Sequence, residues 1–255
     1  MAFSLLKTWR KSGKQKIKQK LFIIPFFFSF LNAFFGLLSV IHTISHNFTF
    51  AAYCILLAAC MDFWDGRLAR AFGSCSDIGM ELDSLCDATS FCFAPAILMY
   101  TWRLADYGPF GLLVVGVYLC AGLYRLAKFN ALHMNAQRHF VGLPTTLAAS
   151  FLATVVIASV WIAQSPLSLL VSHEGLFGMV LVLSVLKLSA WKFLSPKQLN
   201  LHGAKSYLLV AFFGLGCLLL AYAGYPVLFL IALAYVLGNI VFNVITGFLN
   251  MVNVQ

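Results

Sequence analysis

Acidic side chains are scarce in this sequence. Only eight of its 255 residues are Asp or Glu, and charged residues of both signs make up 10% of the chain. So little charge excludes an ordinary soluble domain, in which about a quarter of the residues are charged. Apolar residues take their place, because 62% of the chain is hydrophobic. The composition therefore predicts a protein that crosses a membrane several times.

Long polar linkers and low-complexity segments are also missing. We therefore expect one membrane domain, residues 21–255, behind a basic segment, residues 1–20. Hydropathy predicts an all-α, polytopic helix bundle with about eight membrane spans. The expected spans are 22–43, 48–71, 84–102, 109–131, 142–164, 175–194, 206–224 and 226–249.

The first 20 residues hold seven basic side chains and no acidic one. No small-residue cleavage site follows them, so an uncleaved first span is a better interpretation than a signal peptide. The basic segment acts either as an amphipathic element on anionic lipid or as a topology signal alone.

Basic residues also predict the orientation of the chain. Sixteen of the 17 lie in the N-terminal segment or around the 2–3, 4–5 and 6–7 connections, Lys187 among them, which leaves Arg103 for the other side. The positive-inside rule then places both termini and these connections in the cytoplasm, with the protein in the cell (inner) membrane.

Metal-binding patterns of cysteine are absent. The seven cysteines show no ligand spacing and the six histidines are dispersed, so we interpret the cysteines as small packing residues in a reducing compartment and assign no histidine a catalytic role.

The acidic residues that do occur are concentrated in one stretch. Six of the eight lie between Met61 and Asp87, namely Asp62, Asp65, Asp77, Glu81, Asp83 and Asp87. Residues three or four apart share a helix face, so Asp62 and Asp65 form one pair and Asp83 and Asp87 another, facing each other across a short turn. Four such carboxylates repel one another unless cations neutralise them, and oxygen ligands suit Mg²⁺, Mn²⁺ or Ca²⁺.

The stretch follows the pattern D-x-x-D-G-x-x-A-R, eight residues, then G-x-x-x-D-x-x-x-D. This pattern resembles the signature of the CDP-alcohol phosphotransferases at all eight of its fixed positions, which are Asp62, Asp65, Gly66, Ala69, Arg70, Gly79, Asp83 and Asp87. The resemblance implies an active site on the cytoplasmic side of the second and third helices.

The resemblance also implies roles for these residues. Two divalent cations, Mg²⁺ or Mn²⁺, are expected on Asp62, Asp65, Asp83 and Asp87. Asp87 is also the expected general base for the acceptor hydroxyl. Residues expected to bind CDP-diacylglycerol are Ser29, Asn32, Asp62, Gly66, Ala69, Arg70, Gly79 and Asp83.

Ser29 and Asn32 allow two interpretations. Polar side chains within a membrane helix commonly form interhelical hydrogen bonds, and in the family a Ser or Thr and an Asn at this spacing border the nucleotide pocket. The sequence departs from the family just before them, where Pro25-Phe26 replaces the frequent Pro-Asn.

The fourth expected span ends in a further motif. Arg125 and Lys128 are either snorkelling residues at the interface or part of R-x-A-[RK]-F-N, which with Phe140-Val-Gly-Leu-Pro144 resembles the phosphatidylserine synthase branch. A later segment, 189–197, resembles that branch's S-x-x-R-[FY]-P-S-F-K, with Lys192 in place of Arg. Residues expected on the acceptor or phosphate side are Arg125, Asn130, Lys192 and Lys197.

The function implied is the transfer of a phosphatidyl group from CDP-diacylglycerol to L-serine, which yields phosphatidylserine and CMP. Alternatives are the same chemistry with glycerol 3-phosphate or inositol phosphate as acceptor, a non-catalytic relative, and an ion-coupled transporter that uses the carboxylates. Expected partners are the bilayer and a second copy of the chain in a homodimer. We expect no nucleic-acid partner.

Overall fold

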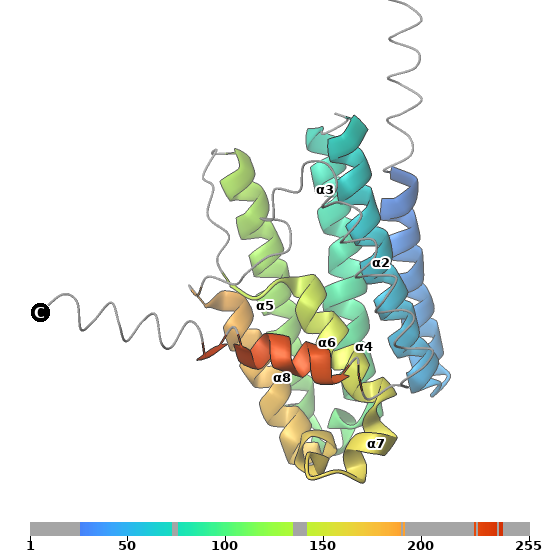
Figure 1. Ribbon diagram of the computed structural model, residues 1–255, viewed down its shortest axis with the longest axis vertical. Coiled ribbons are helices and arrows are strands. Elements are labelled where there is room, and N and C mark those ends of the chain that lie inside the picture. Colours follow the sequence, from blue (N-terminus) through green and yellow to red (C-terminus); the bar gives the residue numbers. More distant parts are fainter. Residues whose placement is uncertain are drawn as a thin grey trace, which may run out of the picture.

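The computed structural model describes residues 26–72, 76–134, 142–189, 191, 227, 229–238 and 240–241. All regular elements in these ranges are helices, as predicted, and Figure 1 shows them as a bundle. In chain order they are an unlabelled first helix Phe26–Ile44, α2 (Phe48–Phe72), α3 (Asp77–Asp87), the π-helix η1 (Ala88–Phe93), α4 (Ala94–Trp102), the 3₁₀ turn η2 (Leu104–Tyr107), α5 (Pro109–Met134), α6 (Thr145–Ile157), α7 (Ser159–Ala163), the 3₁₀ turn η3 (Ser168–Val171), α8 (His173–Leu188) and a last helix Phe229–Gly238. The predicted basic segment 1–20 and the span 206–224 lie outside the described residues, as does much of 226–249.

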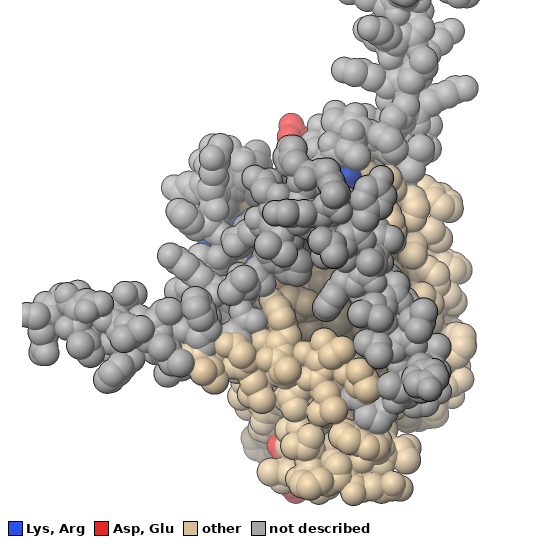
Figure 2. All heavy atoms as spheres, in the orientation of Figure 1, with Lys and Arg blue, Asp and Glu red and all other residues tan. Residues whose placement is uncertain are grey.

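Four of the described helices are long and apolar enough to cross a membrane: Phe26–Ile44, Phe48–Ala69, Asp77–Trp102 and Pro109–Ala131. They correspond to the first four predicted spans, although the third helix begins seven residues before the predicted start at residue 84. In the space-filling view of Figure 2, charged atoms of described residues appear only as small spots in the upper part and at the lower end. A surface of this kind fits a bilayer-spanning bundle.

The fifth and sixth predicted spans are shorter than expected. The predicted span 142–164 is divided at Ala158 into α6 and α7, and α6 has only 13 residues, which is about 20 Å against a hydrocarbon thickness of about 30 Å. Near the break, the hydroxyl of Thr154 donates to the carbonyl of Phe151 at 2.7 Å, and such local bonds tend to bend helices. Helix α8 ends at Leu188, before the predicted limit at residue 194.

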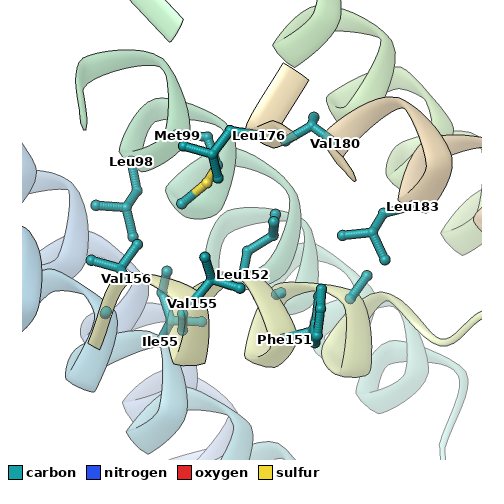
Figure 3. Packing of buried hydrophobic residues seen from close by; sticks show 14 of the residues in the cluster. Ile55, Leu98, Met99, Phe151, Leu152, Val155, Val156, Leu176, Val180 and Leu183 are labelled. Atoms are coloured by element: carbon teal, nitrogen blue, oxygen red, sulfur yellow. The ribbon is translucent and has the colours of Figure 1, made fainter. Parts of the chain in front are cut away.

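The core lies where α4 and α6 meet their neighbours. Helix α2 packs mainly on α6, and α5 packs mainly on α8. Buried alanines between α2 and α6 let the two backbones approach closely. These residues are Ala51, Ala52, Ala58, Ala148, Ala149 and Ala153. Figure 3 shows larger side chains closing the centre: Ile55 beside Val155, Leu98 beside Val156, and Met99 beside Leu176.

The first helix contacts η1 closely at Gly36. A Cβ added there would lie 2.4 Å from Oγ and 2.9 Å from Cα of Ser90, so only glycine permits this contact. One turn earlier, the hydroxyl of Ser90 donates to the backbone carbonyl of Asn32 at 2.8 Å. This pair of contacts fixes the first helix beside the residues that follow Asp87.

The segment Gly142-Leu143-Pro144 joins the end of α8 to the start of α6. Gly142 has a φ of 90°, in the left-handed region that favours glycine, and a Cβ added there would lie 2.5 Å from the carbonyl oxygen of Lys187. The amide of Gly142 donates to the carbonyl of Trp191 at 2.9 Å, and the amide of Leu143 donates to that of Leu186 at 3.0 Å. The motif thus caps α8 and positions the first turn of α6.

Candidate active site

Three carboxylates from two helices converge inside the bundle. Asp62 on α2 and Asp83 and Asp87 on α3 each place a carboxylate oxygen within 4.8 Å of the others. Asp62 precedes the end of α2 at Phe72 by ten residues, and Asp87 follows the start of α3 at Asp77 by ten. Because a helix rises 1.5 Å per residue, the cluster lies about 15 Å inward from the turn between these helices.

Asp65 lies beside this cluster. Its side chain is 4% exposed and interacts electrostatically with Asp83 and Asp62. The hydroxyl of Ser29, on the first helix, donates to Oδ2 of Asp65 at 3.0 Å. The sequence predicted four facing carboxylates; the structure brings three within metal-ligand reach of one another and holds the fourth next to them.

Asn32 connects the first helix to Asp87. Its Nδ2 donates to Oδ1 of Asp87 at 3.0 Å, while its own Oδ1 is buried and has no hydrogen-bond donor in the described part of the chain. Ser29 and Asn32 therefore both form interhelical hydrogen bonds, the first of the two interpretations that their sequence positions allowed. The open amide oxygen of Asn32 leaves one acceptor for a substrate.

The π-helix η1 begins directly after Asp87. A π segment adds a residue to the turn and rotates the following face of the helix, and such segments are frequent at functional sites. Here the rotation turns Ser90 toward the first helix, where it bonds the backbone of Asn32. The sequence analysis did not predict this irregularity.

Thr146 is a site residue that the sequence analysis missed. Its hydroxyl, in the first turn of α6, donates to Oδ2 of Asp62 at 3.4 Å. The signal available in the sequence was its place two residues after Gly142-Leu143-Pro144, a motif that the resemblance had singled out. Only the packing of α6 on α2 shows which residue near that motif reaches a carboxylate.

Arg125 and Asn130, the predicted acceptor-side residues of α5, face α3 in different ways. Arg125 interacts electrostatically with Asp87. Asn130 accepts a hydrogen bond from the hydroxyl of Ser84 at 2.9 Å and donates to Glu81 at 3.2 Å. The side chain of Arg70, and all of Lys192 and Lys197, lie outside the described residues.

The small residues of the signature lie on the same two helices. Gly79 donates its amide to Oγ of Ser76, the N-cap of α3, at 3.1 Å, and a Cβ added to Gly79 would lie 3.1 Å from that oxygen. Gly66 and Ala69 are partly exposed on α2, after Asp62 and Asp65. Small side chains at these positions leave the backbone accessible beside the carboxylates.

Comparison with known proteins agrees with this geometry. A family model described as CDP-alcohol phosphatidyltransferase matches residues 22–191, about two thirds of the chain. The chain belongs to the CDP-alcohol phosphatidyltransferase family. The resemblance seen in the sequence is thereby confirmed, and the transporter hypothesis loses its support.

Relatives within the family carry names that specify a substrate. The chain is 29% identical over 195 residues to a CDP-diacylglycerol–serine O-phosphatidyltransferase of Helicobacter pylori strain J99, covering 76% of this chain and 80% of that protein. It is 34% identical over 125 residues to the Bacillus subtilis protein of the same name, covering 49% of this chain and 70% of that one. An archaetidylserine synthase of Methanothermobacter thermautotrophicus is 37% identical over 128 residues, covering 49% of this chain and 54% of that protein.

The carboxylate cluster of this family member fits divalent metal. Its donors are all oxygen atoms, the ligand type that Mg²⁺ and Mn²⁺ prefer. Asp62 and Asp87 are both buried, and close carboxylates in a buried site need positive charge to be stable together. Asp62, Asp83 and Asp87 form the one group in the described ranges with such spacing among potential ligands.

We predict that Asn32→Leu weakens Mn²⁺ binding by about 10- to 100-fold, because a side chain that orients a metal-binding carboxylate typically contributes that much. Leu keeps the approximate size of Asn32 but removes the donor to Asp87. Titration with Mn²⁺ monitored by electron paramagnetic resonance measures the affinity.

Ser39→Ala is the matched control. Ser39 is buried on the same helix, and its hydroxyl has no hydrogen-bond partner among the described residues, so this variant should bind Mn²⁺ as the wild type does. Equal affinities in both variants would show that Asn32 does not orient Asp87 for metal.

Proposed function

We propose that this protein transfers the phosphatidyl group of CDP-diacylglycerol to the hydroxyl of L-serine and releases CMP. The observation that carries the proposal is the convergence of Asp62, Asp83 and Asp87 in the bundle of a CDP-alcohol phosphatidyltransferase. Serine is proposed as the acceptor because relatives of 29% and 34% identity are named for it. The R-x-A-[RK]-F-N motif around Arg125 supports the same acceptor.

The donor would occupy the face of α2 and α3 that carries the signature. Its pyrophosphate is an anion, and a bare carboxylate cluster would repel it. Two divalent cations held by Asp62, Asp65, Asp83 and Asp87 would neutralise that cluster and polarise the phosphorus that is attacked. Proposed contacts to the donor beyond the carboxylates come from Ser29, Asn32, Gly66, Ala69, Arg70 and Gly79.

Asp87 is the proposed general base. In the reaction the serine oxygen forms a bond to the β-phosphorus, the bond from that phosphorus to the CMP oxygen breaks, and the serine proton passes to a carboxylate oxygen. A serine hydroxyl is a weak nucleophile at neutral pH, so removing its proton accelerates the attack. The hydrogen bond from Asn32 holds the Asp87 carboxylate in a fixed orientation for this role.

The acceptor would enter from the side of α5. Arg125 lies near Asp87 there, and Asn130 extends the polar lining toward α3. Lys192 and Lys197 are proposed to add positive charge on this side. Glycerol 3-phosphate and inositol phosphate remain the alternative acceptors, because their phosphate groups would also use cationic residues.

We further propose eight spans in the domain 21–255, with the site on the cytoplasmic side, in the cell membrane and as a homodimer. The four described spans and the distribution of basic residues support this arrangement.

The assay for the proposed function uses purified protein, CDP-diacylglycerol, Mn²⁺ or Mg²⁺ and a panel of alcohols, with CMP release as the readout. We expect release with L-serine, little with glycerol 3-phosphate or inositol phosphate, and none when a chelator removes the metal. CMP release with another alcohol but not with L-serine would show that this other alcohol is the acceptor. Full activity in chelator would contradict the metal requirement.

The two roles of the carboxylates are separated by comparing Asp87→Asn with Asp62→Asn. We expect Asp87→Asn to lose about 10² to 10⁴ in turnover, the usual contribution of a general base, while it still binds CDP-diacylglycerol with divalent metal. Asp62→Asn should weaken metal and donor binding together. Rate and binding are measured on each variant; near-normal turnover of Asp87→Asn would exclude it as the base.

Orientation is tested with single cysteines at Ser74, Gln137 and Gln198 in a cysteine-free background. We expect impermeant thiol reagents to label all three only from the cytoplasmic side, because basic residues flank each connection. Labelling of the Gln198 position from outside would contradict the proposed number of spans. The proposed homodimer is tested separately, by native mass spectrometry in detergent.

A further inference from the structure

Lys187 is a buried cation with no role in the chemistry above. It lies in the last turn of α8 and is 2% exposed. Its Nζ has no hydrogen-bond acceptor and no ion-pair partner among the residues that the structure describes. The sequence analysis grouped Lys187 with the basic residues around a cytoplasmic connection; the packing of α8 on α5 buries its side chain, which the sequence did not predict.

The ammonium group points at one face of α5. Its Nζ lies 3.2 Å from the ring centroid of Tyr118, and a Cβ added to Gly122 would lie 3.4 Å from it. The same Cβ would lie 2.5 Å from Sγ of Cys92, so the missing side chain of Gly122 makes room for the Cys92 sulfur, and the ammonium lies beside both residues. Tyr118 is itself buried, and its hydroxyl donates to the carbonyl of Phe91 at 3.3 Å, which fixes the ring under the cation.

Arg125 lies on the same face of α5 as Tyr118 and Gly122. Residues 118, 122 and 125 follow the three- and four-residue spacing of one helix face, and Lys187 interacts electrostatically with Arg125. The Nε of Arg125 is also buried without an acceptor in the described residues. Two neighbouring cations thus have unused donors, and one of them, Arg125, interacts with Asp87.

Such an arrangement needs an anion. A buried ammonium is costly unless it is paired, and a ring contact offsets only part of that cost. A second cation adds repulsion. An anion held between Lys187 and Arg125 would use the open donors of both, and charge-assisted bonds to a carboxylate or phosphate are the strong ones.

The position favours the acceptor as the source of that anion. Serine holds its carboxylate two carbons away from its hydroxyl, so a hydroxyl at Asp87 brings the carboxylate to groups that lie next to Asp87. The donor's phosphates belong instead with the carboxylates of α2 and α3, where divalent metal would bind.

We propose that Lys187, together with Arg125, binds the carboxylate of the acceptor and thereby selects L-serine over amino alcohols that lack a carboxylate. This inference rests on the proposed function. Lys187 is a specificity-determining residue in this proposal, and Asp87 keeps the chemistry at the hydroxyl.

The test removes the charge of Lys187 from the protein and the charge of the carboxylate from the acceptor, separately and together. Wild type and Lys187→Met are assayed for CMP release with L-serine and with L-serinamide, in which a neutral amide replaces the carboxylate. Wild type should prefer L-serine. The substitution should lower kcat/KM for L-serine by about 10- to 100-fold, mainly through KM, as expected for a hydrogen bond to a charged group, and should leave kcat/KM for L-serinamide within about twofold of wild type, because no bond to the amide depends on that charge.

Arg103→Met is the control, because it removes a cation that also lies over an aromatic ring, Trp102, but at the opposite end of α4 from the carboxylates. This variant should have the wild-type kcat/KM for both L-serine and L-serinamide. Thermal stability and CDP-diacylglycerol binding are measured on every variant, and Lys187→Gln replaces Lys187→Met if the latter does not fold.

Each result bears on one proposal. Equal losses with both acceptors, or no loss with L-serine, would overturn the role of Lys187 and leave the proposed function intact. If wild type had equal kcat/KM values for L-serine and L-serinamide, that result alone would overturn the role of Lys187. Absence of CMP release from wild type with L-serine, when another alcohol is accepted, would instead overturn the proposed function.

Discussion

Mutual repulsion of buried carboxylates is the constraint on which this structure depends. Asp62, Asp83 and Asp87 approach within 4.8 Å inside an apolar bundle, where charges interact more strongly than in water. The burial of Asp62 and Asp87 removes these two carboxylates from water and so raises the demand for compensating positive charge. Divalent metal, as proposed above, would satisfy that demand without a permanent protein cation and would leave the site attractive to a pyrophosphate.

Neutral hydrogen-bond donors arrange the carboxylates without neutralising them. Ser29 donates to Asp65, Asn32 donates to Asp87, and Thr146 donates to Asp62. These donors come from the first helix and from α6, so two further helices orient the acids of α2 and α3. Permanent cations in the same places would compete with metal, whereas hydroxyl and amide groups fix geometry and keep the negative charge available.

Two protein cations neighbour each other on α5 and α8. Arg125 interacts electrostatically with Asp87, and Lys187 interacts with Arg125. Asp87 thus belongs to the carboxylate cluster and also interacts with one of these cations. In the proposed reaction the two substrates would use these groups differently. The diphosphate would bind through metal at the carboxylates, and the acceptor carboxylate would bind the cations.

The membrane class, the first four spans and the family followed from the sequence alone, because hydropathy and the spacing of Asp62 to Asp87 are local properties of the chain. The inward convergence of the carboxylates was also predictable, since helix periodicity determines which residues share a face. Thr146 and Lys187 were not predictable, because their roles depend on α6 packing against α2 and α8 against α5, contacts between residues far apart in the chain. The π segment after Asp87 and the break at Ala158 were not predictable either, because hydropathy measures the apolar length of a segment and not the regularity of its backbone hydrogen bonds.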